Sequence, residues 1–75
     1  MRLRVFYFAN LREERGCSEE DVFLEEEQTL CSLFLSIFGR EPIGVRFAIN
    51  QSYVEANTVP SPNDEVAFLP PLGGG

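Results

Sequence analysis

The sequence predicts an α+β fold in which one main helix packs across a mixed β-sheet. One segment, residues 30–38, has apolar residues at the spacing of a helix face, whereas two segments before it and three after it alternate like half-buried strands. The 75 residues are 44% hydrophobic and include seven Phe, which is typical of one small domain with its own core. We therefore expect a single domain over residues 1–69, followed by a flexible glycine tail over residues 70–75.

The first two strands are predicted to pair with each other. Residues 2–9 alternate apolar side chains with charged and then aromatic ones, as expected for a strand. Residues 10–16 are polar and end in a glycine, which indicates a loop or a single helical turn. Residues 21–25 alternate again, and we expect this second strand to pair back on the first as a hairpin with a long connection.

The main helix is predicted to begin after Thr29 and to end at Gly39. Thr29 is a favourable N-cap residue, and large apolar residues recur every three or four positions across residues 30–38. We interpret the two phenylalanines of this segment as core residues. The acidic run at residues 25–27 is interpreted as a solvated strand end near the start of the helix, so no metal site is expected there.

Three further strands are predicted after the helix, over residues 45–50, 53–54 and 65–69. Residues 57–64 are rich in proline, asparagine and aspartate, which indicates a loop with a tight turn at Asn63 and Asp64. The first and last strands are expected to be adjacent and parallel at the centre of the sheet. This arrangement is a β-grasp, and its last strand would direct the tail away from the domain.

The tail, residues 70–75, is the segment that we expect to be functional. Pro70 and Pro71 lack backbone N–H groups, so the tail should leave the sheet in an extended conformation. The three glycines that end the sequence would let the chain pass through a narrow channel and present the carboxylate of Gly75 at its end. A frayed terminus and a cloning scar are the other two interpretations of a glycine run.

The composition disfavours several classes of function. A formal net charge of −6 opposes binding to phosphate backbones, so we expect no nucleic-acid partner and instead a protein partner with a basic surface. The sequence has no histidine and no lysine, so we expect no catalytic site, metal or bound cofactor in this chain. Cys17 and Cys31 lack CxxC spacing, and neither a signal peptide nor a long apolar run occurs, which predicts a cytoplasmic protein with reduced thiols and no membrane contact.

Three stretches of the chain have a recognisable pattern: VFYFANLRE at residues 5–13, FAINQSYV at residues 47–54 and NDEVAFLPPLGGG at residues 63–75. Together they resemble the molybdopterin synthase small subunit family, whose members are ubiquitin-like sulfur carriers. The last stretch is the most specific, because it joins a turn, an apolar strand, a proline pair and a glycine terminus. Asn63 stands where the family usually has glycine, and Gly73 stands where it often has Ser, Thr or Ala.

The resemblance implies a function and a set of partners. An E1-like adenylyltransferase, using ATP and Mg²⁺, would join the carboxylate of Gly75, next to Gly74, to AMP. Sulfur from a cysteine desulfurase or a rhodanese would then convert this carboxylate into a thiocarboxylate. The large subunit of molybdopterin synthase would receive the tail and transfer the sulfur to cyclic pyranopterin monophosphate, in molybdenum cofactor biosynthesis.

A docking surface is predicted beside the tail. Leu69 on the last strand, Tyr53 on the short strand and Phe8 on the first strand are expected to form one exposed apolar patch. The resemblance places Arg12 at the edge of this patch, and we call these four residues the docking patch. Core packing is the other interpretation of Phe8 and Leu69. The tail residues expected to contact the partner are Pro70, Pro71, Leu72 and Gly73.

Two other functions are kept as alternatives. A thiamine-type sulfur carrier is also a short β-grasp protein that ends in a glycine pair, and it can share an AINQ-like segment, here residues 48–51. A ubiquitin-like protein modifier would form isopeptide bonds through Gly75, although the absence of lysine excludes conventional chains of the protein on itself. An autonomous enzyme is the weakest interpretation, because the usual acid–base residues are missing.

Overall fold

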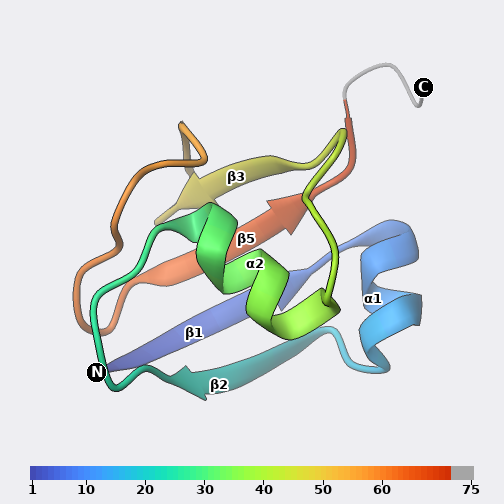
Figure 1. Cartoon of the computed structure of the whole chain (residues 1–75). Coiled ribbons are helices and arrows are strands. Elements are labelled where there is room, and N and C mark those ends of the chain that lie inside the picture. Colours follow the sequence, from blue (N-terminus) through green and yellow to red (C-terminus); the bar gives the residue numbers. More distant parts are fainter. Residues whose placement is uncertain (72–75) are drawn as a thin grey trace.

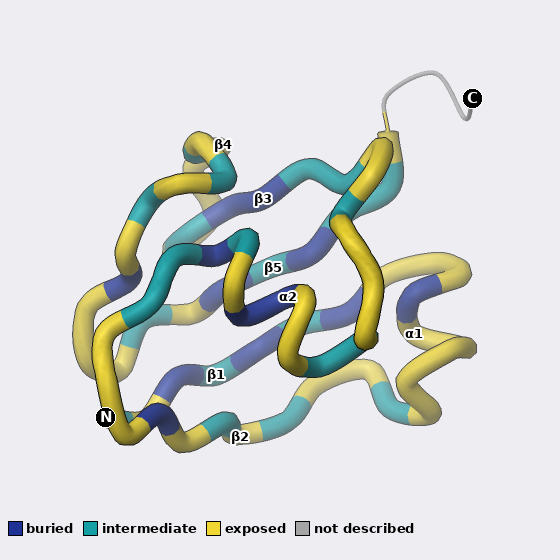
Figure 2. Tube along the Cα trace, in the orientation of Figure 1, coloured by how far each residue is buried: buried dark blue, intermediate teal, exposed yellow. Residues whose placement is uncertain are grey.

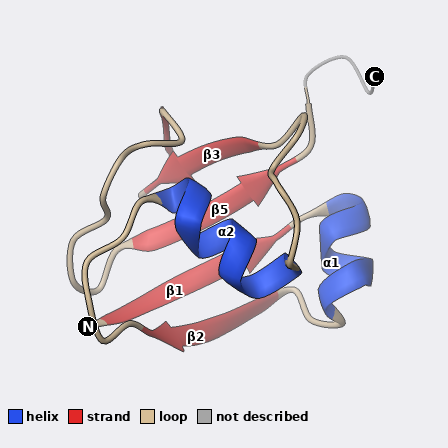
Figure 3. Ribbon diagram, in the orientation of Figure 1, coloured by secondary structure: helices blue, strands red, loops and turns tan. Residues whose placement is uncertain are grey.

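The computed structural model of the chain describes residues 1–71. The predictions made for Leu72, Gly73, Gly74 and Gly75 fall outside the described residues. Figures 1 and 3 show how its helices and strands are arranged. The elements in chain order are β1 (Arg2–Tyr7), α1 (Ala9–Arg15), β2 (Glu19–Phe23), α2 (Leu30–Phe38), β3 (Arg46–Ile49), β4 (Ser52–Val54) and β5 (Glu65–Leu69).

The five strands form one mixed sheet in the order β2-β1-β5-β3-β4. β1 and β5 are parallel neighbours at its centre, and the other neighbouring pairs are antiparallel. α2 crosses one face of the sheet (Figure 1), and we call the opposite face the open face. The predicted α+β architecture, a β-grasp with adjacent and parallel first and last strands, is confirmed.

The hydrophobic core lies between α2 and the sheet (Figure 2). Phe34 of α2 is fully buried, and its ring meets the rings of Phe47 and Phe68 edge-on, with centroids 6.4 and 5.2 Å apart. Phe38 stacks on Phe34 at a centroid distance of 4.6 Å. Edge-on and offset aromatic pairs stabilise a core beyond the area that they bury. The interpretation as a core residue is therefore confirmed for Phe34, and Phe38 is partly buried and packs against the core.

The ends of α2 are where the sequence predicts them. The hydroxyl group of Thr29 accepts a hydrogen bond from the backbone N–H of Ser32 at 3.1 Å, which satisfies one of the free donors of the first turn. Gly39 has a φ of +72° and donates its N–H to the carbonyl oxygen of Leu35. Glycine adopts this left-handed conformation without the steric cost of a Cβ atom, which is why the helix ends there.

The segment predicted as a loop or a single turn is instead a seven-residue helix, α1. Leu11 anchors it, because its side chain is 2% exposed and packs into the core. The preceding strand ends at Tyr7 and does not reach Ala9, which has a φ of +51° and turns the chain. Gly16 caps the C-terminal end by donating its N–H to the carbonyl oxygen of Arg12.

The second strand lies two residues earlier than the predicted range of 21–25. Its register is set by β1, because Phe23 is opposite Arg2, the first residue of that strand. Beyond this pair, the backbone N–H of Leu24 donates to the carbonyl oxygen of Met1, and the Met1 ammonium group donates to the carbonyl oxygen of Leu24. The end of β2 is therefore determined by where its partner begins, a non-local constraint.

A polar cluster joins β1, α1 and β2. The Tyr7 hydroxyl group and the Nε atom of Arg15 both donate to Oε2 of Glu20, each at 2.6 Å. The hydrogen bond from Arg15 is the main cause that lowers the pKa of the Glu20 carboxyl group, and Tyr7 lowers it further. Burial, followed by the hydrogen bond to Glu20, raises the pKa of the Tyr7 hydroxyl group.

We expect Glu20→Gln to lower the free energy of unfolding by about 1 kcal/mol at pH 7, after a discount for solvent exposure. The folded-state pKa of Glu20 is depressed, so its stabilising effect is present above the unfolded pKa of about 4.3 and is lost as the pH falls through the folded value. Urea unfolding of wild type and variant between pH 7 and pH 3 would measure this. A stability difference that does not shrink at low pH would contradict the prediction. Glu19→Gln, which removes an exposed ion pair with Arg4, is the matched control and should have the smaller effect.

Candidate functional site

The carboxyl end of β5 is where the tail leaves the domain. Because β1 and β5 are parallel and β3 is antiparallel to β5, β1 and β5 end where β3 begins. α1 follows β1 on this side, and the loop between α2 and β3 reaches it from the helix face (Figure 1). We call this side of the sheet the tail edge. Segments that are distant in the sequence therefore surround the base of the tail.

Three docking-patch residues lie on the open face at or near the tail edge. Leu69 is the last residue of β5, is half-buried and pairs with Arg46 of β3. Tyr53 lies on β4, the next strand outward, and 66% of its surface is exposed. Phe8 directly follows β1, and the parallel register of β1 and β5 brings it level with Leu69. All three side chains are at least partly exposed on the same face of the sheet, and the prediction that they form one docking surface stays a prediction.

Phe8 is exposed, as predicted, but it does not lie in the predicted element. It stands at the N-cap position of α1 and is not part of the first strand. Its exposed side chain excludes the alternative that it is a core residue. Together with Phe6 and Ala67, it lines an open-face pocket of about 330 Å³. Arg12 lies in the last turn of α1, is exposed, and forms no ion pair with any residue between 1 and 71.

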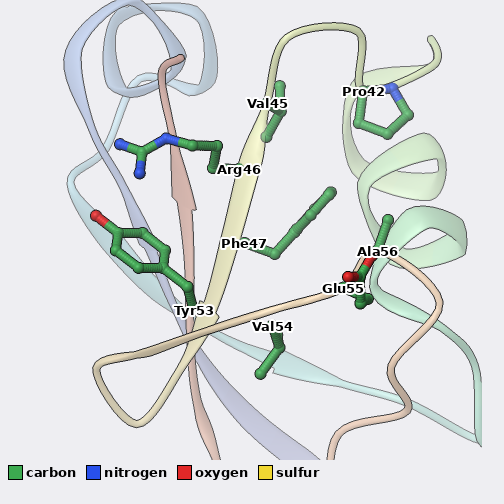
Figure 4. Close-up of a pocket in the computed structure, with 8 residues that line it drawn as sticks. All are labelled: Pro42, Val45, Arg46, Phe47, Tyr53, Val54, Glu55 and Ala56. Carbon is green, nitrogen blue, oxygen red and sulfur yellow. The ribbon is translucent and has the colours of Figure 1, made fainter. Parts of the chain in front are cut away.

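Arg46, the first residue of β3, is a site residue that the sequence analysis missed. Its guanidinium group lies over the ring of Tyr53, with Cζ 4.7 Å from the ring centroid (Figure 4). Its Nε–H group donates a hydrogen bond to the carbonyl oxygen of Pro70 at 3.0 Å. A cation–π contact at an exposed site contributes about 0.5–1 kcal/mol. In the sequence, Arg46 is simply the outward residue of an alternating strand, and only the β3–β4 hairpin brings it beside Tyr53.

The loop between α2 and β3 also comes close to the tail. Gly44 has a φ of +74°, and a Cβ atom added to it would lie 4.0 Å from Cγ of Pro71. Next to it, Ile43 is 84% exposed, the highest value among the large apolar residues of the described part. Both residues were missed, because a loop rich in proline and glycine does not indicate which strand end it will contact.

The outer edge of the sheet beside Arg46 is hollowed (Figure 4). β4 has only three residues and ends opposite Phe47, so Arg46 at the start of β3 has no neighbouring strand on this outer side. The result is an open pocket of about 560 Å³, and its lining is mainly apolar. The residues that line it are Pro42, Val45, Arg46, Phe47, Tyr53, Val54, Glu55 and Ala56.

The part of the chain that the structure describes holds no metal-binding cluster of side chains. No group of three or more His, Cys, Asp or Glu side chains in this part of the chain is arranged to hold a metal ion. Cys17 and Cys31 are free thiols, and both are partly buried. No helix among these residues has the length and apolar character needed to cross a membrane.

The fold and the tail edge define a ubiquitin-like β-grasp protein. The chain belongs to the ThiS family, whose model matches residues 5–75. It is 35% identical to the molybdopterin synthase sulfur carrier subunit of Homo sapiens, with 99% of this chain and 94% of the relative covered. It is 34% identical to the subunit of the same name from Chlamydomonas reinhardtii, with both chains fully covered. The predicted resemblance to molybdopterin synthase small subunits is confirmed.

Solved structures with the same fold include a putative molybdopterin converting factor, subunit 1, from Pyrococcus furiosus. It has a TM-score of 0.79 and 26% sequence identity, and the match covers 96% of this chain and 99% of that chain. Small archaeal modifier protein 1 of H. volcanii has a TM-score of 0.76, with 95% of this chain and 98% of that chain covered. At 16% identity, the similarity to this protein concerns the fold alone.

Proposed function

We propose that this chain is the sulfur carrier subunit of a molybdopterin synthase and that its Gly75 carries the sulfur as a thiocarboxylate. The observation that supports this most strongly is the full-length identity of 35% and 34% to two molybdopterin synthase sulfur carrier subunits. A second support is the position of the tail base, Pro70, beside an apolar part of the open face. A domain without histidine or lysine suits this role, because the partners would supply the catalytic groups.

The proposed chemistry begins with activation of a carboxylate, which is a poor acyl donor. A carboxylate oxygen of Gly75 attacks the α-phosphorus of ATP in an E1-like adenylyltransferase, pyrophosphate leaves, and an acyl-adenylate forms. The outer sulfur of a persulfide on a cysteine desulfurase or a rhodanese then attacks the acyl carbon, and AMP leaves with its bonding electron pair. A second thiol cleaves the S–S bond of the resulting acyl disulfide, which releases the thiocarboxylate on Gly75 and leaves a disulfide on the donor. ATP and Mg²⁺ belong to the activating enzyme in this scheme.

The large subunit of molybdopterin synthase is the proposed acceptor. The tail would enter the acceptor's active site, with Pro70 to Gly73 in its first part and Gly74 beside the reactive end. The docking patch would rest on the acceptor's surface, where half-buried Leu69 and exposed Tyr53 can both be covered. The acceptor would transfer the sulfur to cyclic pyranopterin monophosphate. A cytoplasmic location, where all these partners would be found, is part of the proposal.

Reconstitution with purified partners tests this function. The protein is incubated with the adenylyltransferase, ATP, Mg²⁺ and the sulfur donor, and its intact mass is measured. We expect a gain equal to the mass difference between sulfur and oxygen. The loaded protein is then given to the large synthase subunit with cyclic pyranopterin monophosphate, and separately to the thiazole-forming enzyme of thiamine biosynthesis. Dithiolene formation supports the proposal, whereas thiazole formation alone, or larger conjugates in cells, would replace it with one of the alternatives.

A further inference from the structure

The hydrogen-bond ladder between β5 and β3 ends just before the tail. Leu69 and Arg46 are the last residues in register between these two strands. Pro70 follows, and as a proline it has no N–H group with which to continue the ladder. Its carbonyl oxygen, the first beyond β5, accepts its hydrogen bond from the Nε–H group of Arg46. At the first residue of the tail, a side-chain hydrogen bond therefore replaces the backbone hydrogen bonds of the sheet.

This one hydrogen bond has a large effect on the direction of the tail because few torsions are free there. The pyrrolidine rings hold φ near −65° at both Pro70 and Pro71, and the peptide bond between them is planar. The torsion that remains at Pro70 is ψ, which sets the orientation of its carbonyl group. A donor held against that carbonyl oxygen therefore fixes the plane of the next peptide bond.

The donor is itself held in place. Stacking on the ring of Tyr53 positions the guanidinium plane of Arg46 (Figure 4), and the hydrogen bond to Pro70 is partly buried. A guanidinium group can stack through its face and donate through its edge at the same time, whereas a lysine ammonium group offers neither a plane nor an Nε–H fork. Two residues before Arg46, Gly44 lies near Pro71, because a Cβ atom added to Gly44 would be 4.0 Å from Cγ of Pro71.

We propose that Arg46 is a positioning residue that fixes the direction in which the tail leaves the sheet, so that the tail enters a partner's active site already oriented. This inference rests on the proposed function and adds a residue to it. Preorganisation lowers the conformational entropy that must be lost on binding. It also raises the fraction of docked complexes in which the reactive end is correctly placed, and this should be visible in the rate of sulfur transfer.

The functional test separates transfer from docking. Thiocarboxylated wild type, Arg46→Lys and Arg46→Ala are mixed with saturating large subunit, and single-turnover sulfur transfer is timed. We expect both variants to transfer sulfur about tenfold more slowly, the effect of one lost hydrogen bond to a charged donor. The dissociation constant of the complex should rise by a smaller factor, because the docking patch is unchanged. If only Arg46→Ala is slow and Arg46→Lys transfers sulfur at the wild-type rate, Arg46 acts through its charge alone. If the variants bind more weakly but transfer sulfur at the wild-type rate, Arg46 acts in docking. Either result would overturn the proposal.

Arg2 and Tyr53 provide the matched variants. Arg2→Ala removes an exposed arginine at the start of β1, the end of the sheet opposite the tail edge, and should transfer sulfur at the wild-type rate. Tyr53→Ala removes the ring and should reproduce part of the Arg46→Ala defect. Equal transfer by Tyr53→Ala and wild type would show that the stack does not hold Arg46, and would contradict this part of the inference.

A spectroscopic measurement tests the geometry without any partner. In the wild-type protein, NMR should detect scalar coupling between the Arg46 Nε–H group and the carbonyl carbon of Pro70, and a nuclear Overhauser contact between Gly44 and Pro71. We expect both signals to persist in Tyr53→Phe, and Arg46→Ala to weaken the Gly44–Pro71 contact. If the signals are present but wild type transfers no sulfur, the proposed function fails and the positioning geometry stands. Absence of both signals in wild type would refute the positioning role, whatever the chain transfers.

Discussion

Removal of Gly75 is expected to reduce adenylylation and sulfur transfer by at least about 100-fold while leaving the domain as stable as before. The shortened chain still ends in a glycine pair, so its terminal chemistry is unchanged. Its reach, however, falls by about 3.5 Å, and a misplacement of about 1 Å at a reacting centre can already cost 100-fold. Every buried core residue lies between Leu3 and Phe68, so thermal unfolding should be unaffected. Intact mass after reaction with the adenylyltransferase and the sulfur donor measures the loss.

A length-restoring variant is the control for this deletion. It lacks Gly75 and has a serine inserted between Pro71 and Leu72, so its glycine pair returns to the original distance from the sheet. We expect it to recover most of the transfer rate. If the simple deletion accepted AMP and transferred sulfur at the wild-type rate, the terminal position of Gly75 would have no role and the proposed function would be wrong.

Elements whose signals are local were predicted closely from the sequence. α2 has an N-cap at Thr29, a C-terminal glycine at Gly39 and a regular apolar spacing between them, and its predicted bounds agree with the structure. β5 was also predicted residue for residue, because proline follows it directly. The turn before β5 uses a φ of +68° at Asn63, a conformation that asparagine tolerates better than most residues.

Elements determined by distant contacts were predicted less well. α1 is short, has no side-chain N-cap bond and buries one residue, Leu11, so its pattern could not be distinguished from a loop. β2 ends where β1 begins, and nothing within residues 19–25 signals that boundary. Register is a property of two strands together, so alternation in one of them identifies its faces but not its limits.

The site shows the same division. Alternation placed Leu69 and Tyr53 on the outward face, and the structure agrees. Arg46 contacts the tail base and Gly44 lies near it, and these residues come from a strand and a loop more than twenty positions earlier in the chain. Both residues reach the tail only because β3 is antiparallel to β5, and the order of elements in the sequence does not by itself indicate this pairing. Their roles therefore became apparent only from the folded structure.

Leu69→Lys is expected to weaken binding to the large synthase subunit by at least about 30-fold, the loss typical of a residue at the centre of an interface. The substitution places a charge in the docking patch, where it would have to be desolvated, and it repels a partner with a basic surface. Lysine is preferable to aspartate because an aspartate here would attract Arg46, the cross-strand neighbour, away from Pro70. Calorimetry with the purified large subunit measures the dissociation constant.

Phe23→Lys is the matched control for this substitution. Phe23 is 73% exposed and pairs with an arginine, Arg2, so the new lysine meets the same cross-strand repulsion that Leu69→Lys meets beside Arg46. Its pair with Arg2 lies at the start of β1, the end of the sheet opposite the tail edge. Both variants should lose a similar, small amount of stability, about 0.5 kcal/mol, but only Leu69→Lys should lose binding. Equal binding by the two variants, whether tight or weak, would remove Leu69 from the docking surface and leave the tail as the main contact with the partner.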